Sequence, residues 1–310
     1  MTPPPGVALG RLAGFALIVV AAVTWGTTGA TMKLVGRHSP MSPLLIGFFR
    51  VAFAAPALVV AARILVRPRP HPAPGDRLRL LAGGLAMGAY QACYFWAVAK
   101  TSVAVGSLIA ICSAPLMMTL LAALWLGERI GAVTGTALGV GIVGAALLTA
   151  GPHGLGAPPP GFLSGVGLAF GAGLSYAVYA VTVKDLAGRL PPLAIASGTF
   201  TVAAVSLLPA LVVERPTGGP VAWAWLAYLG LVPTALAYGL YTVGLRTTPV
   251  TVSGILTLVE PLTATTLGVL VFGDRLGTAG ALGALLLVTA VAVLAVGAGA
   301  AGQTDPTGGY

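Results

Sequence analysis

The chain has 310 residues, of which 57% are hydrophobic and 7% are charged, and its mean hydropathy is +0.97. Soluble globular proteins carry about 25% charged residues, so this composition excludes a soluble protein and predicts an integral membrane protein. The net charge of +9 does not indicate a nucleic-acid partner, because an excess of Lys and Arg is typical of the cytoplasmic loops of membrane proteins.

Apolar runs long enough to cross a hydrocarbon core of about 30 Å recur along the whole chain. Turn-like or charged segments separate them, and no loop is long enough to hold a soluble domain. The sequence therefore predicts an all-α polytopic membrane protein with a single membrane domain over residues 1–310. The ten predicted spans are residues 12–35, 43–66, 78–99, 102–125, 131–150, 161–183, 192–213, 222–245, 248–271 and 277–298.

The distribution of Lys and Arg predicts the orientation of these spans. With the N-terminus inside, ten of these residues fall on the inner side and five on the outer side, leaving out Arg50 within a span. Because cytoplasmic loops are the more basic, we expect a multi-pass protein of the cell inner membrane with both termini cytoplasmic. The first apolar run also resembles a secretory signal peptide, but we expect it to be retained because it has a counterpart in the second half.

The sequence contains an internal repeat. At a constant offset of 146, Lys100 matches Arg246 and "GERI" matches "GDRL". At an offset of 151, "TWGTTGATMK" at residues 24–33 pairs with "SYAVYAVTVK" at residues 175–184. The second half of the chain is therefore a divergent copy of the first.

The two copies are predicted to have opposite orientations in the membrane. Residues 12–150 and 161–298 each hold five predicted spans, and an odd number of spans turns the second copy upside down. Inverted repeats are typical of secondary transporters, whose substrate site lies near the midplane between the halves. Two similar halves of opposite orientation can exchange conformations, so that a gate closed on the outside becomes a gate closed on the inside. The pattern therefore predicts a transporter that works in this way.

Two segments share a pattern of Pro, an apolar helix and then Gly, an acid and Arg: "ICSAPLMMTLLAALWLGERI" and "LVEPLTATTLGVLVFGDRL". With "FFRVAFAAPAL" at residues 48–58, they resemble the EamA type of the drug/metabolite transporter (DMT) superfamily. The resemblance implies ten helices, efflux of small metabolites, amino acids or drugs, and a substrate cavity between spans 1, 3 and 4 and spans 6, 8 and 9. Asp274 stands where this family usually has Glu.

Glu260 is an acidic residue within a predicted span. A charge at the bilayer centre costs about 2.5–3.5 kcal/mol and normally faces an interior or a wet cavity. We expect Glu260 to couple transport to protons, to contact a substrate amine, or to form a charge pair with Arg50, which lies at a similar predicted depth. Pro261 has no N–H, so we also expect a carbonyl one turn earlier to face the cavity.

Polar and aromatic residues within the spans predict the substrate site, since small-molecule sites combine aromatic walls with a few polar groups. The threonines near Trp25 lie on one helix face and serve either this pathway or helix–helix contact. The predicted substrate-binding residues are Trp25, Thr28, Tyr90, Gln91, Tyr94, Tyr176, Tyr179, Tyr238, Tyr241 and Glu260.

Two further patterns indicate structural roles. We interpret "GERI" and "GDRL" as helix caps and hinge clamps, whose acids suit the start of the next helix. Gly131, Gly135 and Gly139 recur at every fourth residue, and this small-residue face serves either internal packing or a homodimer contact.

No enzyme motif of the G-x-S-x-G, H-E-x-x-H or Walker A type occurs, and the scattered His and Cys residues predict no metal and no cofactor. We therefore expect an exporter, not an enzyme, that moves a small-molecule substrate across the lipid bilayer by alternating access, with proton or exchange coupling. The alternatives are an uncoupled facilitator of a small polar solute and, in a different class, a membrane enzyme acting on lipid-linked substrates.

Overall fold

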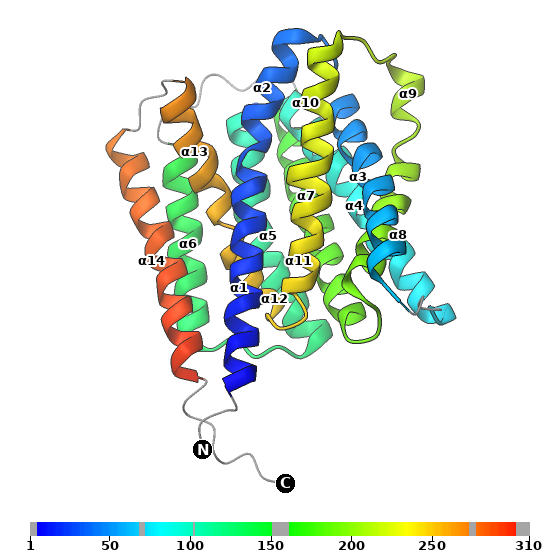
Figure 1. The fold of residues 1–310 in the computed structure, drawn as a ribbon. Coiled ribbons are helices and arrows are strands. Elements are labelled where there is room, and N and C mark those ends of the chain that lie inside the picture. The colour runs from blue at the N-terminus through cyan, green and yellow to red at the C-terminus, as the bar shows by residue number, and fades with distance from the viewer. Residues whose placement is uncertain (1–4, 68–71, 102, 151–160, 273–276, 302–310) are drawn as a thin grey trace.

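The computed structural model describes residues 5–67, 72–101, 103–150, 161–272 and 277–301. Over these residues the chain is a bundle of helices without strands (Figure 1). The helices are α1 (Pro5–Gly26), α2 (Thr28–His38), α3 (Pro43–Leu65), α4 (Pro74–Lys100), α5 (Val103–Leu126), α6 (Ala132–Ala150), α7 (Phe162–Ala187), α8 (Pro192–Ser206), α9 (Ala210–Val213), α10 (Pro220–Gly230), the π-helix η1 (Leu231–Leu236), α11 (Ala237–Gly244), α12 (Val250–Leu256), α13 (Val259–Phe272) and α14 (Thr278–Ala301).

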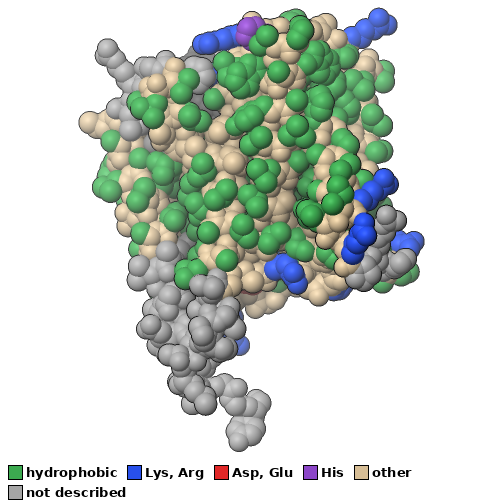
Figure 2. All heavy atoms as spheres, viewed as in Figure 1, with side chains coloured by type: hydrophobic (Ala, Val, Ile, Leu, Met, Phe, Trp, Pro, Cys, Tyr) green, Lys and Arg blue, Asp and Glu red, His purple; other side chains and the backbone are tan. Residues whose placement is uncertain are grey.

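Several of these helices are long and apolar enough to cross a membrane. Figure 2 shows a broad band of hydrophobic side chains, with the visible Lys, Arg and His side chains toward the two ends. This pattern is that of an all-helical polytopic membrane protein. The seven candidate spans are Leu12–His38, Pro43–Leu65, Ile109–Leu126, Phe162–Ala187, Pro192–Val213, Pro220–Gly244 and Val250–Val271, and shorter apolar helices cover Ala132–Leu147 and Thr278–Val293.

Local sequence explains where several helices begin and end. Proline stands in the first turn of α3, α4, α8 and α10, where its missing N–H costs nothing and its fixed φ suits the helix. The Ser42 hydroxyl caps α3 by accepting a hydrogen bond from the Leu45 N–H at 3.3 Å. Gly127 ends α5 with a φ of +68°, a conformation that favours glycine over other residues.

The first helix of each half packs on the other half of the chain. Helix α1 lies against α11 and α13, whereas α7 lies against α4 and α5. The other large contacts pair α8 with α3 and α4, and α6 with α14. The helices that the resemblance assigned to the substrate cavity are thus among those that meet between the halves, but the helices of the other spans meet there too.

The repeat-related residues Lys100 and Arg246 lie at opposite ends of α7. A Cβ on Gly165, near the start of α7, would be 2.9 Å from the Lys100 Cβ. The Arg246 carbonyl accepts a hydrogen bond from the Lys184 Nζ at 3.5 Å, near the end of α7. Gly165 and Lys184 are separated by about 28 Å of helix at 1.5 Å per residue, so the two repeat positions face opposite ends of the bundle.

The first and ninth predicted spans are interrupted rather than continuous, and so is the seventh, between α8 and α9. The first breaks at Thr27, between α1 and α2, and the ninth breaks between α12 and α13. The prediction that Pro261 leaves a carbonyl free is wrong, because the Glu260 N–H donates to the Thr257 carbonyl at 2.9 Å. Backbone irregularity at membrane depth is tolerated where neighbouring groups satisfy it.

Gly26 allows the breaks in the first and ninth spans to approach each other. A Cβ there would lie 2.5 Å from the Thr263 Cβ and 2.8 Å from the Glu260 carbonyl oxygen. The break in the first span is therefore held against the first turn of α13, which carries Glu260.

Candidate functional site

Aromatic side chains from both halves of the chain form one connected group in the core. Trp25 of α1 lies 4.7 Å from Tyr238 and 5.3 Å from Tyr241 of α11, measured between ring centroids. It meets Tyr176 of α7 edge-on at 6.3 Å, and Tyr176 lies 5.5 Å from Tyr90 of α4. We call this group the aromatic cluster; it comprises Trp25, Tyr90, Tyr94, Tyr176, Tyr179, Phe200, Tyr238 and Tyr241.

The structure brings together every aromatic residue that the sequence assigned to the substrate site. Tyr94 joins through Tyr90 at 6.0 Å, and Tyr179 joins through Tyr238 at 5.9 Å. Phe200 of α8 was missed, although its ring lies 4.8 Å from Tyr238. Its neighbours Thr199 and Thr201 are polar, but its predicted span holds no other aromatic residue, so the aromatic pattern did not single it out.

Most of the aromatic cluster is tightly packed. Trp25, Tyr179, Tyr238 and Tyr241 are buried, whereas Tyr90 and Tyr94 are only partly so. The cluster is thus a wall of tilted and edge-on rings, with its partly exposed members on α4.

Five of the predicted substrate-binding residues hold buried polar atoms without a hydrogen-bond partner among the described residues: the Trp25 Nε1, the Thr28 Oγ1, the Gln91 Oε1 and the hydroxyls of Tyr176 and Tyr179. The Gln91 amide nitrogen has only a weak sulfur acceptor, the Met87 Sδ at 3.8 Å. A buried polar group left unpaired costs about 1–3 kcal/mol. A polar solute beside these groups would recover that free energy.

Arg50 of α3 is buried and held by the π-helix. Its Nε donates to the Thr234 Oγ1 at 2.8 Å and its Nη2 to the Pro233 carbonyl at 3.4 Å. The Thr234 hydroxyl in turn donates to the Leu229 carbonyl at 2.7 Å. The sequence did not predict this role of Thr234. The available signal was Pro233, because a proline inside an apolar run indicates an irregular helix, and π-bulges in helices are frequent at functional sites.

Glu260 lies in the first turn of α13 and is partly exposed. Within the described part of the chain its carboxylate makes no hydrogen bond and no ion pair within 4.0 Å, but the Arg50 charge acts on it at longer range. Tyr90 and Tyr238 lie within the electrostatic reach of both charges. Arg50 and Glu260 are therefore neighbours across the site rather than a direct salt bridge.

A lysine near the end of α7 holds the connection that follows α11. The Lys184 Nζ donates to the Leu245 carbonyl at 2.7 Å, the Thr248 carbonyl at 2.9 Å and the Arg246 carbonyl at 3.5 Å. The Thr247 hydroxyl also donates to the Gly10 carbonyl of α1 at 3.1 Å. This end of the bundle is the one at which α1 begins and α14 ends (Figure 1).

Glu128 of the "GERI" segment binds the same connection from the first half of the chain. Its Oε1 accepts a hydrogen bond from the Val250 N–H at 2.8 Å, and its Oε2 accepts from the Thr251 N–H and hydroxyl at 3.1 and 3.0 Å. The expectation that this acid would serve the next helix is wrong, because it caps α12 of the other half. Asp274 of "GDRL" lies outside the described residues. We call Lys184, Glu128 and segment 245–251 the 245–251 latch.

Ion pairs reinforce this end of the bundle. Arg189, after α7, binds Asp76 of α4 at 3.1 Å and also pairs with Asp185. Arg79 of α4 binds Asp185 at 2.8 Å. Together with the 245–251 latch, these contacts close the described part of the bundle at the end where α1 begins.

The opposite end is joined by polar contacts between the two halves. The Ser42 N–H donates to the Glu214 Oε1 at 2.9 Å, and the Ser39 hydroxyl donates to the Thr217 carbonyl at 2.8 Å. Helix α2 packs on α10 and α13 nearby.

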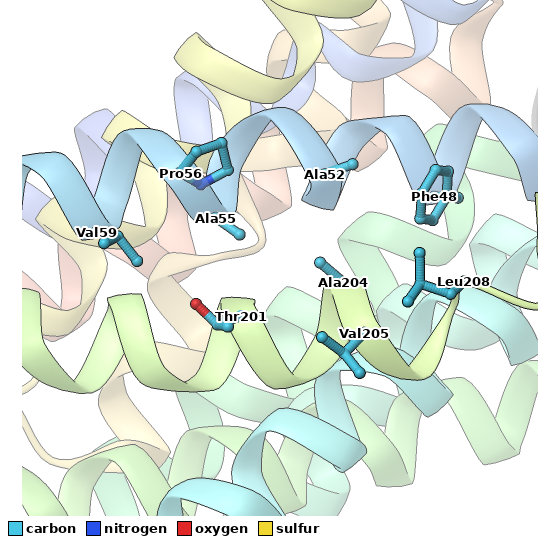
Figure 3. A pocket seen from close by; sticks show the side chains of 9 residues that line it. All are labelled: Phe48, Ala52, Ala55, Pro56, Val59, Thr201, Ala204, Val205 and Leu208. Carbon is cyan, nitrogen blue, oxygen red and sulfur yellow. The ribbon is translucent and has the colours of Figure 1, made fainter.

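An apolar groove of about 340 Å³ lies between α3 and α8. The side chains of Ala55 and Val59 on α3 point toward Thr201 and Ala204 on α8 across it (Figure 3). The Thr201 hydroxyl already donates to the Ser197 carbonyl at 2.7 Å, so the groove offers little to a polar solute and is separate from the aromatic cluster.

The glycine face of α6 does not serve internal packing at two of its positions. A Cβ on Gly139 would meet nothing within 4 Å, and one on Gly135 would meet only Ile130 at 3.9 Å. The packing of α6 on α14 instead uses Gly144, where an added Cβ would lie 2.9 Å from the Gly283 carbonyl oxygen. The homodimer contact stays a prediction. Among the described residues, no group of His, Cys, Asp and Glu has the arrangement of a metal site.

Known proteins with similar sequences are transporters. An uncharacterized transporter of Bacillus subtilis (strain 168), YwfM, is 30% identical to this chain over 89% of the chain and 92% of its own length. A probable terminal-alkyne amino-acid exporter of Streptantibioticus cattleyicolor is 30% identical over 71% of this chain and 72% of its own length. A solved crystal structure with 22% identity matches 94% of this chain and 98% of its own with a TM-score of 0.79, which shows a shared fold.

The family signature occurs twice in the chain. The sequence profile of the EamA-like transporter family matches residues 12–150 and again residues 163–296. Together the two matches cover most of the chain. The chain therefore belongs to the EamA-like transporter family, within the drug/metabolite transporter superfamily.

Proposed function

We propose that this chain is a secondary active exporter of a small metabolite, amino acid or drug that works by alternating access. Its family supports transport, and the relative named as an exporter of terminal-alkyne amino acids makes amino acids the first solutes to test. The observation that carries the proposal is the meeting of aromatic, polar and charged side chains from both halves in one buried region.

The proposed architecture is ten membrane spans in two inverted five-helix repeats, residues 12–150 and 161–298. Two separate matches to one family profile support the repeat. The placement of Lys100 and Arg246 at opposite ends of α7 supports the inversion. In this proposal α4, α6 and α14 cross the membrane in addition to the seven candidate spans.

We place the protein in the cell inner membrane with both termini in the cytoplasm. The excess of Lys and Arg on the side of the N-terminus supports this orientation. The 245–251 latch then lies on the cytoplasmic side, and we assign the conformation described above to a state closed toward the cytoplasm.

The repeat-related counterparts of the latch residues support alternating access. By the repeat, Lys33 is the counterpart of Lys184, and the connection around Lys100 is the counterpart of segment 245–251. We propose that Lys184 holds the cytoplasmic end closed in one state and that Lys33 holds the outer end closed in the other. Two similar halves of opposite orientation can exchange these conformations around one site.

Glu260 is the proposed proton-coupling residue. It is the acid placed within a span beside the aromatic cluster, and no hydrogen bond fixes its carboxylate among the described residues. A carboxyl group that faces the substrate region in both states can carry a proton in one direction while the solute leaves in the other.

Counterflow into liposomes that contain the purified protein tests this proposal. We expect amino acids or small amines to exchange across the membrane, faster with an imposed pH gradient than without one. Glu260→Gln should remove the effect of the gradient while the protein stays folded, whereas Glu214→Gln, at the bundle end, should keep it. Exchange that never responds to the gradient would favour an uncoupled facilitator, and product formed in detergent without compartments would favour an enzyme.

A further inference from the structure

The buried charge of Arg50 is bound only to neutral acceptors. Its side chain is 5% exposed, and within the described part of the chain its partners are the Thr234 hydroxyl and the Pro233 carbonyl. A buried ion without a counter-ion in contact carries a desolvation penalty. Ionisable residues within membrane spans typically mark a substrate or ion pathway.

The guanidinium has donors left for that group. Arginine offers five N–H donors, and its two hydrogen bonds use the Nε and one hydrogen of the Nη2. The Nη1 and the second Nη2 hydrogen form the outer fork of the guanidinium. This fork matches a carboxylate, which it binds with two parallel hydrogen bonds.

Glu260 provides a charge of opposite sign in the same region. Its carboxylate has no hydrogen-bonding partner among the described residues, and its side chain is partly exposed. Both charges act on Tyr90 and Tyr238, and the Trp25 ring lies 4.7 Å from the Tyr238 ring at a tilt of 47°. A cation next to Glu260 would therefore also have the faces of aromatic rings within the same cluster, which attract cations.

The net charge of the site decides which solute it suits. Arg50 and Glu260 together are neutral, so a solute of net charge would leave one uncompensated charge within the membrane, which is unfavourable. A zwitterion keeps the site neutral and supplies both missing partners. We propose that Arg50 and Glu260 form a two-pole site for a zwitterionic amino acid, with the substrate carboxylate on Arg50 and its ammonium on Glu260.

This inference rests on the proposed export function and specifies its substrate. The test uses counterflow with the twenty common amino acids, L-propargylglycine and L-homoserine, followed by charge-edited derivatives of whichever is exchanged best. The methyl ester removes the negative pole, and the N-acetyl form removes the positive pole. We expect each derivative to compete at least about tenfold more weakly than the parent amino acid.

Variants assign the two poles. Arg50→Gln should reduce the ratio by which the parent amino acid competes better than its methyl ester. Glu260→Gln should reduce the ratio by which the parent amino acid competes better than its N-acetyl form. Arg63→Gln, which removes an exposed charge from the same helix, should keep both preferences. The Glu260→Gln substitution replaces a carboxylate that bonds to no described residue, so that arm stays informative even where Arg50→Gln fails to fold.

The outcomes separate this inference from the function on which it rests. Derivatives that compete as well as the parent, or variants that leave both preferences unchanged, would overturn the two-pole site. Exchange of an amine drug but of no amino acid would overturn it too, while leaving export intact. Failure of amino acids, amines and drugs alike to exchange would instead refute the proposed function.

Discussion

Replacing Lys184 by Ala should open the end of the bundle that the 245–251 latch closes. The Lys184 ammonium donates to the Leu245 carbonyl at 2.7 Å and to the Thr248 carbonyl at 2.9 Å. Hydrogen bonds with a charged partner contribute about 1.5–3 kcal/mol each. The substitution removes both, together with the longer contact to Arg246.

The expected net effect is smaller than the sum of these bonds. Lys184 is only partly buried, and the released carbonyls regain water at the end of the bundle, so we take about 2 kcal/mol for the whole contact. A change of about 2 kcal/mol shifts the ratio of open to closed molecules by about 30-fold. The closed state should still fold, because the Glu128 cap on α12 is untouched.

A buried reporter behind the latch measures this shift. Ser253 of α12 is fully buried, so Ser253→Cys, in a chain whose Cys93 and Cys112 are replaced by Ala, should react slowly with a membrane-impermeant maleimide. In inside-out vesicles Lys184→Ala should raise the reaction rate by up to about 30-fold, provided that opening limits labelling. Arg63→Ala should leave the rate unchanged, and Lys184→Arg should give an intermediate rate.

An unchanged labelling rate in a well-folded Lys184→Ala protein would refute this reasoning. It would mean that the ion pairs among Asp76, Arg79, Asp185 and Arg189, rather than the lysine, hold the end closed.

Two other substitutions separate packing from binding. Trp25→Phe keeps an aromatic ring against Tyr238 but removes the unpartnered indole N–H. The half-saturating substrate concentration in counterflow should rise several-fold while the melting temperature changes little. A large fall in melting temperature would indicate a packing role instead. Gly26→Ala adds a Cβ 2.5 Å from the Thr263 Cβ and should destabilise the protein by about 1–3 kcal/mol, seen as a lower melting temperature. Gly29→Ala is its control, since an added Cβ there meets nothing within 4 Å; matching losses in the two variants would contradict the close approach of α1 and α13.

The sequence predicted the membrane class, the family and every residue of the aromatic cluster except Phe200. Composition alone decides the first, because so few charges cannot cover a water-facing surface. The repeat located Trp25 and Tyr176 as counterparts, and the structure places their rings 6.3 Å apart. The positions of Arg50 and Glu260 within their spans also predicted a similar depth in the membrane. In the structure the Arg50 charge acts on Glu260.

What the sequence missed are contacts that depend on how helices break and cross. The π-helix that holds Arg50 arises around Pro233, but a proline in an apolar run does not say whether the helix kinks, breaks or widens. Glu128 was expected at the start of its own next helix, yet it caps α12 of the other half, because tertiary packing brings that helix start closer. Phe200 completes the aromatic cluster from a span with no other aromatic residue.

The most direct measurement of the central claim is the side of the membrane on which residues 100 and 246 lie. In a chain without other cysteines, Lys100→Cys and Arg246→Cys are each labelled with an impermeant maleimide in intact cells and in inside-out vesicles. If the halves are inverted, position 100 reacts from outside and position 246 from the cytoplasmic side. Labelling of both positions from the same side would contradict two inverted halves around a shared site.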